Sequence, residues 1–278
     1  MHSDWGDFLM EDYQLESCWG WEDSEHAHYT NDLRCFNPPD NAKNALILGC
    51  GTGIGVLKEA MKNPDCYFTG VDMNASHIDT ARNALKATTL NNASFVEMSF
   101  EDFKGLERYD YIYCWGVYSS VKPEVREHLN RIFHDNIKPN GLVTVTYDNA
   151  IWSQKVIGYR NIAIALGRQF KGNTEKTIQA LRLLTTRGPY KDDKGFENYV
   201  EYIWKQPGAA EHNMTQPYWQ PLYSFEVAKT FKGMGFEYDE TRSLGVPSDP
   251  LKEALNQGET YRVETWSASK EALLPSRS

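Results

Sequence analysis

Residues 46–55 read LILGCGTGIG, a short apolar run that leads directly into closely spaced glycines. An apolar run of this length is typical of a buried parallel strand, and the residues after the glycines have a helical pattern. Glycine permits the positive φ angles of a tight turn and lets a ligand approach the main chain closely. Because the following helix offers free N–H groups, this segment is a candidate nucleotide-binding loop.

A carboxylate follows the next expected strand at the spacing that nucleotide binding requires. This strand, Tyr67–Val71, leads into Asp72. A carboxylate at the end of the second strand, about 20 residues beyond the glycines, accepts hydrogen bonds from ribose hydroxyls. We therefore expect a ligand with an unphosphorylated ribose.

The middle of the chain, residues 45–149, alternates short apolar runs with amphipathic stretches, which predicts β-α-β units and a parallel sheet. A turn is expected at Pro139–Gly141. The expected strands are Ala45–Leu48, Tyr67–Val71, Ser94–Met98, Tyr109–Cys114 and Leu142–Tyr147, and the expected helices are Gly55–Met61, Ser76–Thr88 and Pro123–Ile137.

The second half of the chain has helical spacing at first and little periodicity afterwards. Residues 153–187 predict two helices that are separated at Lys171–Asn173. Residues 187–223 are rich in Gly, Pro and aromatic side chains. The elements expected after them are a helix at Ser224–Gly233 with Ser224 as its N-cap, and two strands that pair as a hairpin at the sheet edge, Phe236–Ser243 and Tyr261–Ser269.

The glycines Gly49, Gly51 and Gly53 have the spacing G-x-G-x-G, whereas the dinucleotide fingerprint needs a glycine where this chain has Ile54. Together with Asp72, this run resembles the class I S-adenosylmethionine-dependent methyltransferases. Residues 95–103, 111–117 and 138–142 are similar to later segments of that family, so the resemblance covers residues 40–150.

Two positions depart from the family pattern. Ile47 stands where an acid is usual, and Ser99 stands where an aspartate is frequent. Residues 114–119 and 146–149 are similar to a narrower group, the methyltransferase module that precedes a methyltransferase regulatory domain in bacterial proteins.

The resemblance and the element pattern predict an α/β fold: a Rossmann-like, seven-stranded, mostly parallel sheet with helices on both faces and an inserted helical and aromatic lid. Four parts are expected: an aromatic cap segment at 1–40, a cofactor-binding core at 41–150, the inserted lid or substrate-binding region at 151–223, and a C-terminal helix with antiparallel strands at 224–270.

The resemblance implies that S-adenosylmethionine is the cofactor and S-adenosylhomocysteine its product, and no metal site is expected. The residues expected to bind the cofactor are Gly49, Gly51, Gly53, Asp72, Met73, Ser99, Phe100, Glu101, Cys114 and Trp115.

The acceptor should lie over the fourth and fifth strands, because ligands of open α/β sheets bind beyond the carboxyl ends of the strands. The insertion is far longer than a usual connection, and we predict that it closes over the substrate with the aromatic N-terminal segment. The residues expected to bind the substrate are Trp19, Trp21, Tyr118, Tyr147, Trp152, Trp219 and Tyr223.

Methyl transfer is an in-line displacement, so a base is needed only when the nucleophile arrives protonated. The candidates for this base are Tyr118, Asp148 and His212, and each has a structural alternative. Tyr118 is also consistent with a packed hydroxyl, Asp148 with a turn residue or an N-cap, and His212 with a surface histidine. Trp152 and Trp219 are also consistent with core packing.

Charge and composition exclude several classes of partner. The chain has 29 basic and 38 acidic residues, a net charge of -9, so no nucleic-acid partner is expected. The apolar runs are far shorter than the roughly 20 residues that cross a bilayer, so no membrane partner is expected. The 5 scattered cysteines and the acidic N-terminus predict a cytoplasmic protein with reduced thiols. The sequence leaves the oligomeric state open.

The leading hypothesis is an enzyme that transfers a methyl group to an O or N atom of a small-molecule acceptor, a metabolite or natural-product intermediate. The aromatic-rich insertion favours it. One alternative is a protein or peptide methyltransferase of the lysine type, which the acidic charge balance suits. Another is a non-catalytic S-adenosylmethionine-binding regulator, for which Ile47 is the best argument.

Overall fold

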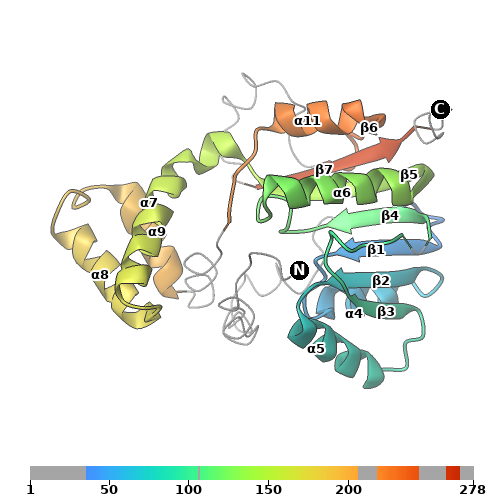
Figure 1. Ribbon diagram of the computed structural model, residues 1–278, viewed down its shortest axis with the longest axis horizontal. Coiled ribbons are helices and arrows are strands. Elements are labelled where there is room, and N and C mark those ends of the chain that lie inside the picture. Colours follow the sequence, from blue (N-terminus) through green and yellow to red (C-terminus); the bar gives the residue numbers. More distant parts are fainter. Residues whose placement is uncertain (1–35, 106, 206–217, 244–260, 270–278) are drawn as a thin grey trace. The chain divides into compact units, whose positions relative to one another are not determined.

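The structure, a computed structural model, describes residues 36–105, 107–205, 218–243 and 261–269. Within these residues, seven strands form one sheet in the order β3-β2-β1-β4-β5-β7-β6 (Figure 1). The strands are β1 (Asn44–Leu48), β2 (Tyr67–Asp72), β3 (Ala93–Glu97), β4 (Tyr109–Cys114), β5 (Ile137–Asp148), β6 (Phe236–Tyr238) and β7 (Tyr261–Ala268).

The sheet is mostly parallel. The first five strands pair in parallel, whereas β7 pairs antiparallel with both β5 and β6. The expected seven-stranded sheet and the antiparallel pair at its edge are therefore confirmed.

Helices connect the strands and continue beyond β5. They are α4 (Ile54–Lys62), α5 (Ala75–Lys86), α6 (Pro123–Asn136), α7 (Ala150–Gln169), α8 (Thr174–Thr186), α9 (Lys194–Lys205) and α11 (Ser224–Gly233). Of the helices in the described ranges, none has both the length and the apolar character needed to span a membrane.

Helices pack on both faces of the sheet. On one face, buried residues of α4 and α5 form a core cluster that includes Leu142 of β5. On the other face, Phe231 of α11 stacks on Trp266 of β7 with ring centroids 5.0 Å apart, and Phe231 also contacts Phe133 of α6 at 5.7 Å. Trp266 pairs with Val143, the neighbour of Leu142, and successive side chains of a strand point to opposite faces.

The strand order reverses at β1, because β2 lies on one side of this strand and β4 on the other. In open α/β sheets, ligands bind beyond the carboxyl ends of the strands at such a reversal. Leu48 and Cys114, which end β1 and β4, are paired in register. The glycine loop and the segment after β4 therefore leave the sheet at the same edge.

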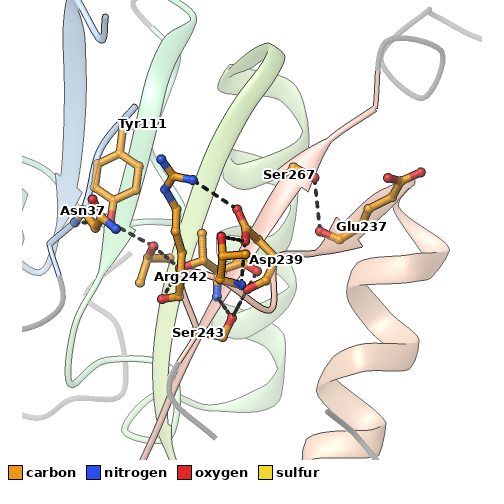
Figure 2. Close-up of polar contacts among 10 residues, drawn as sticks. Asn37, Tyr111, Glu237, Asp239, Arg242, Ser243 and Ser267 are labelled. Atoms are coloured by element: carbon orange, nitrogen blue, oxygen red, sulfur yellow. Dashed lines mark hydrogen bonds and ion pairs between the residues drawn. The ribbon is translucent and has the colours of Figure 1, made fainter. Parts of the chain in front are cut away.

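Polar contacts cross the half of the sheet that contains β4, β5 and β7 (Figure 2). The Tyr111 hydroxyl donates to Thr144 Oγ1 at 2.8 Å, and the hydroxyls of Thr144 and Thr265 lie 2.9 Å apart. The Thr265 N–H donates to Ser243 Oγ at 2.8 Å. These contacts connect β4, β5 and β7 to the turn after β6, and they satisfy hydroxyl groups that the sheet buries.

The described residues divide into two units. The sheet unit takes its residues from 36–151 and 219–269, and the helical unit from 152–218. The helical unit has its own core, in which Phe196, Val200 and Ile203 of α9 pack with buried residues of α7 and α8.

Helix α9 was not expected, because residues 187–223 are rich in Gly, Pro and aromatic side chains. Its buried residues Phe196, Tyr199, Val200 and Ile203 nevertheless recur at helical spacing. This local pattern was the signal that could have found the helix.

Three details at the ends of elements also differ from the expectations. Tyr223 is the N-cap of α11 and Ser224 its first helical residue, so the predicted cap is wrong. Strand β6 ends at Tyr238, because the Asp239 carboxylate accepts hydrogen bonds from the N–H and the hydroxyl of Thr241 and forms a turn. The expected turn at 139–141 lies inside β5, where Asn140 has a φ of 61° and the pairing with β4 shifts.

Candidate functional site

The loop between β1 and α4 has the backbone that its glycines predict. Gly49, Gly51 and Gly53 have φ angles of 73°, 55° and 73°, which side chains other than glycine adopt only with strain. A Cβ at Gly49 would overlap Val117, and one at Gly53 would lie 2.5 Å from the Phe95 ring. A Cβ at Gly51 would meet nothing within 4 Å, so the main chain at this glycine faces open space.

The Asp72 carboxylate connects the end of β2 to this loop. Its Oδ2 accepts a hydrogen bond from the Gly51 N–H at 2.9 Å, and its Oδ1 accepts one from the Asn74 N–H at 2.9 Å. The Asn74 side chain in turn caps α5 by accepting from the Ser76 N–H at 2.9 Å. The carboxylate is therefore held beside the glycine that faces open space.

Ile47 precedes the glycine turn and Cys50 lies within it, and neither side chain adds charge to it. Ile47 is buried in the core cluster with α4 and α5, where an acid would lose its hydration. Burial, and secondly the negative charge of Asp72, raise the pKa of the Cys50 thiol well above its ordinary value. A ligand ammonium group is therefore expected to contact main-chain carbonyls or another side chain, and this contact stays a prediction.

The segment after β3 forms a polar turn. The Ser99 hydroxyl donates to Asp102 Oδ2 at 3.0 Å and accepts from the Asp102 N–H at 3.1 Å. Phe100 is partly exposed and Glu101 is exposed. Met73, which directly follows Asp72, is also partly exposed.

The end of β4 contributes the last two expected cofactor residues. Cys114 is fully buried, and this burial raises the pKa of its thiol, so its side chain is not exposed to a ligand. Trp115 is partly exposed and stacks on Tyr113 with ring centroids 5.9 Å apart. The expected cofactor residues therefore all lie at the carboxyl ends of β1 to β4.

The end of β5 brings two sequence-predicted residues into direct contact. Asp148 Oδ2 accepts a hydrogen bond from Trp219 Nε1 at 2.8 Å. The Asp148 N–H donates to Ser119 Oγ at 2.7 Å, and its carbonyl accepts from the Leu222 N–H at 2.8 Å. These bonds fix the carboxylate and the indole beyond the carboxyl end of the strand. Tyr223, which caps the next helix, stacks on Phe225 at 5.3 Å.

Tyr118 is placed in the core, which corrects its assignment as the first candidate base. Its side chain is 2% exposed, and its hydroxyl donates to Asn130 Oδ1 at 2.8 Å. The rings of Phe133 and Phe231 pack around it, and burial raises its pKa strongly. This is the packed hydroxyl that the sequence also allowed.

Tyr147 is likewise a core residue, in contrast to the expected contact with substrate. It is fully buried, and its hydroxyl donates to Glu264 Oε1 at 2.7 Å. Arg262 Nη2 lies 2.9 Å from the same oxygen. Tyr147 therefore belongs to a buried polar cluster between β5 and β7.

The remaining predicted residues are not all described. Trp19, Trp21 and His212 lie outside the described residues. Trp152 lies in α7, and its side chain is outside the description. The lid closure stays a prediction.

The sequence reasoning missed His77, which is buried in the first turns of α5. Its Nδ1 lies 3.6 Å from Asp72 Oδ1. The available signal was its position in the helix that begins just after Asp72, because this places a polar side chain near the end of β2.

Comparison with known proteins gives a family match within the sheet unit. A family model described as "Methyltransferase domain" matches residues 46–143. The uncharacterized protein RP789 of Rickettsia prowazekii is 27% identical over 151 residues, which are 54% of this chain and 27% of that protein. Thiocyanate methyltransferase 1 of Brassica oleracea is 29% identical over 105 residues, or 37% of this chain and 45% of that protein.

Among solved structures, PKMT2 from Rickettsia typhi is similar with a TM-score of 0.66 and 18% identity, over 89% of this chain and 53% of that chain. The chain thus spans only part of the length of these relatives. The family match includes the glycine loop and Asp72, and the fold agrees with it. Residues 46–143 therefore match a methyltransferase domain, and the fold of the sheet unit is similar to that of PKMT2.

Proposed function

We propose that this protein transfers a methyl group from S-adenosylmethionine to an oxygen or nitrogen atom of a small-molecule acceptor. The observation that carries the proposal is the bond between Asp72 Oδ2 and the Gly51 N–H, 2.9 Å long, beside a glycine whose missing Cβ leaves open space. This arrangement combines a carboxylate for ribose hydroxyls with a main chain that a ligand can approach.

The residues present fit this cofactor. Asp72 would accept the ribose hydroxyls, and the loop at Gly51 would contact the rest of the ligand through the main chain. The turn at residues 99–101 and the exposed part of Trp115 would lie against the adenine. When bound, S-adenosylmethionine supplies a methyl group that is activated by its positively charged sulfur.

Asp148 and Trp219 are the proposed acceptor residues. Because Trp219 Nε1 donates to Oδ2, the carboxylate has a fixed direction before the substrate arrives. In this role Asp148 orients the acceptor hydroxyl or amine by hydrogen bonding and takes up its proton when the acceptor arrives protonated. Tyr223 and Trp219 offer aromatic surface to the acceptor.

The test is transfer of labelled methyl from S-adenosylmethionine into fractionated cell extract. We expect label in the small-molecule fraction, and Asp148→Asn should lower the rate about 100-fold, the contribution typical of a general base. Asp135→Asn is the matched control, because this carboxylate is 68% exposed on α6 and should leave the rate unchanged. Label in no small molecule would contradict the proposal.

A protein or peptide acceptor is the second candidate, and the net charge of -9 favours it, because an acidic protein attracts a basic acceptor. The same labelling experiment separates the candidates, since label would then appear in polypeptide. Binding of S-adenosylhomocysteine without any transfer would instead support the non-catalytic regulator.

A further inference from the structure

His77 is a buried histidine beside the carboxylate that is proposed to hold the ribose. Its side chain is 9% exposed and that of Asp72 is 14% exposed. The distance between His77 Nδ1 and Asp72 Oδ1 is 3.6 Å. At this separation, the imidazole packs directly against one carboxylate oxygen.

The local backbone fixes this placement. The Asn74 side chain accepts hydrogen bonds from the N–H groups of Ser76 and His77 at 2.9 and 3.4 Å, which starts α5. The N–H of Asn74 donates to the same Asp72 oxygen that faces the imidazole. The carboxylate, the cap and the first turns of the helix therefore form one connected unit.

The hydrogen bonds that the Asp72 carboxylate accepts leave a role for the His77 side chain. Main-chain N–H groups of Gly51 and Asn74 reach one oxygen each, whereas a carboxylate offers about four acceptor positions. The other acceptor positions face ribose hydroxyls only while the carboxylate stays in one rotational orientation. A buried ring 3.6 Å from Oδ1 restricts rotation of the carboxylate away from this orientation.

We infer that His77 is a positioning residue that holds the Asp72 carboxylate in the orientation required for ribose binding. This inference rests on the proposed function, because it assigns a supporting residue to the same cofactor site. Side chains that bind a ligand need supporting contacts to keep their geometry, and these contacts change affinity without touching the ligand.

The test measures S-adenosylhomocysteine binding by calorimetry for the wild type, His77→Leu and His77→Gln. Leucine fills the volume without a polar group, whereas glutamine keeps a hydrogen-bond donor. We expect His77→Leu to weaken binding about fivefold and His77→Gln to stay within about twofold of the wild type, as for coupled neighbours. His134→Leu is the control, since this histidine on α6 pairs with Asp135.

The same substitutions in an Asp72→Asn background show whether His77 acts through Asp72. We expect His77→Leu to change binding by less than about twofold there, because the group that it positions is altered. An equal loss in both backgrounds would overturn the inference, and so would equal affinities of His77→Leu and His77→Gln. Where Asp72→Asn binds too weakly to titrate, the comparison of leucine with glutamine decides. Failure of the wild type to bind contradicts the proposed function itself.

Discussion

The two halves of the proposed site are built in different ways. In the cofactor half, consisting of residues 49–53 and Asp72, the geometry comes from positive φ angles and from N–H groups of the main chain. In the acceptor half, consisting of Asp148 and Trp219, it comes from a bond between side chains 71 residues apart. Local sequence determines the first half, whereas the second depends on which distant segments the fold brings together.

A buried charge pair lies on β7, which pairs with β5, the strand that ends at Asp148, and its disruption gives the largest expected effect. Arg262 and Glu264 are each 2% exposed and lie 2.9 Å apart. Arg262→Met should lower the free energy of unfolding by about 3–5 kcal/mol, because it leaves a carboxylate buried without its cation. Urea unfolding measures this, and a loss below about 1 kcal/mol would show that the pair is unimportant.

The double variant Arg262→Met/Glu264→Met is the control for this prediction. Removal of both charges should recover part of the lost stability, because no buried charge then remains without a partner. S-adenosylhomocysteine affinity of the folded protein should be unchanged in both variants, since the cofactor half does not include this pair.

In the cofactor half, Gly53→Ala should cost about 3 kcal/mol of stability, because a side chain at its φ of 73° is strained and its Cβ would lie 2.7 Å from that of Ala81. Chemical unfolding checks the value. Gly51→Ala provides the contrast, with a stability cost of only about 1–2 kcal/mol from its φ of 55°.

Binding of S-adenosylhomocysteine should be weakened more by Gly51→Ala than by Gly53→Ala, which is the opposite of the order expected for stability. The Cβ added at Gly51 points into the open space of the proposed site, so we expect its variant to fold and yet bind S-adenosylhomocysteine at least about tenfold more weakly. Normal binding by the folded Gly51→Ala protein would place the ligand elsewhere.

Much of the fold could be predicted from the sequence, because short apolar runs and glycines act locally. Five expected strands have bounds within one residue of those observed, and β4 matches at both ends. The hydrogen-bond partners of the buried tyrosine hydroxyls could not be predicted. Tyr118 and Tyr147 have partners at Asn130 and Glu264, and no local pattern indicates such partners. The pairing of Asp148 with Trp219 was missed for the same reason, although both residues were expected near the acceptor.

Tyr118→Phe tests whether this tyrosine belongs to the core or to the chemistry. Loss of the hydrogen bond to Asn130 should lower stability by about 1 kcal/mol, with methyl transfer unchanged. A thermal melt and the labelling assay measure both quantities. A large fall in the transfer rate with normal stability would return Tyr118 to the catalytic residues.

An effect of similar size, which depends on pH, is expected at the opposite end of β1 and β4. Burial tends to raise the pKa of Asp110, but the N–H groups of Lys43 and Asn44 and the ammonium of Lys138 outweigh it and lower this pKa. A lowered pKa in the folded state stabilises the protein above the ordinary carboxyl pKa of about 4, and this contribution is lost as the pH falls through the folded value.

Asp110→Asn should therefore reduce stability by about 1 kcal/mol at neutral pH. The difference from the wild type should shrink below pH of about 4. Urea unfolding across this pH range is the measurement, and a constant difference would show that the charge of Asp110 is not involved.

Binding of S-adenosylhomocysteine to the wild type and to Asp72→Ala tests the central claim most directly. We predict that the wild type binds in calorimetry and that Asp72→Ala binds at least about tenfold more weakly, because ribose hydroxyls lose a charged acceptor. Equal binding by both proteins, or no binding by a folded wild type, would contradict the account.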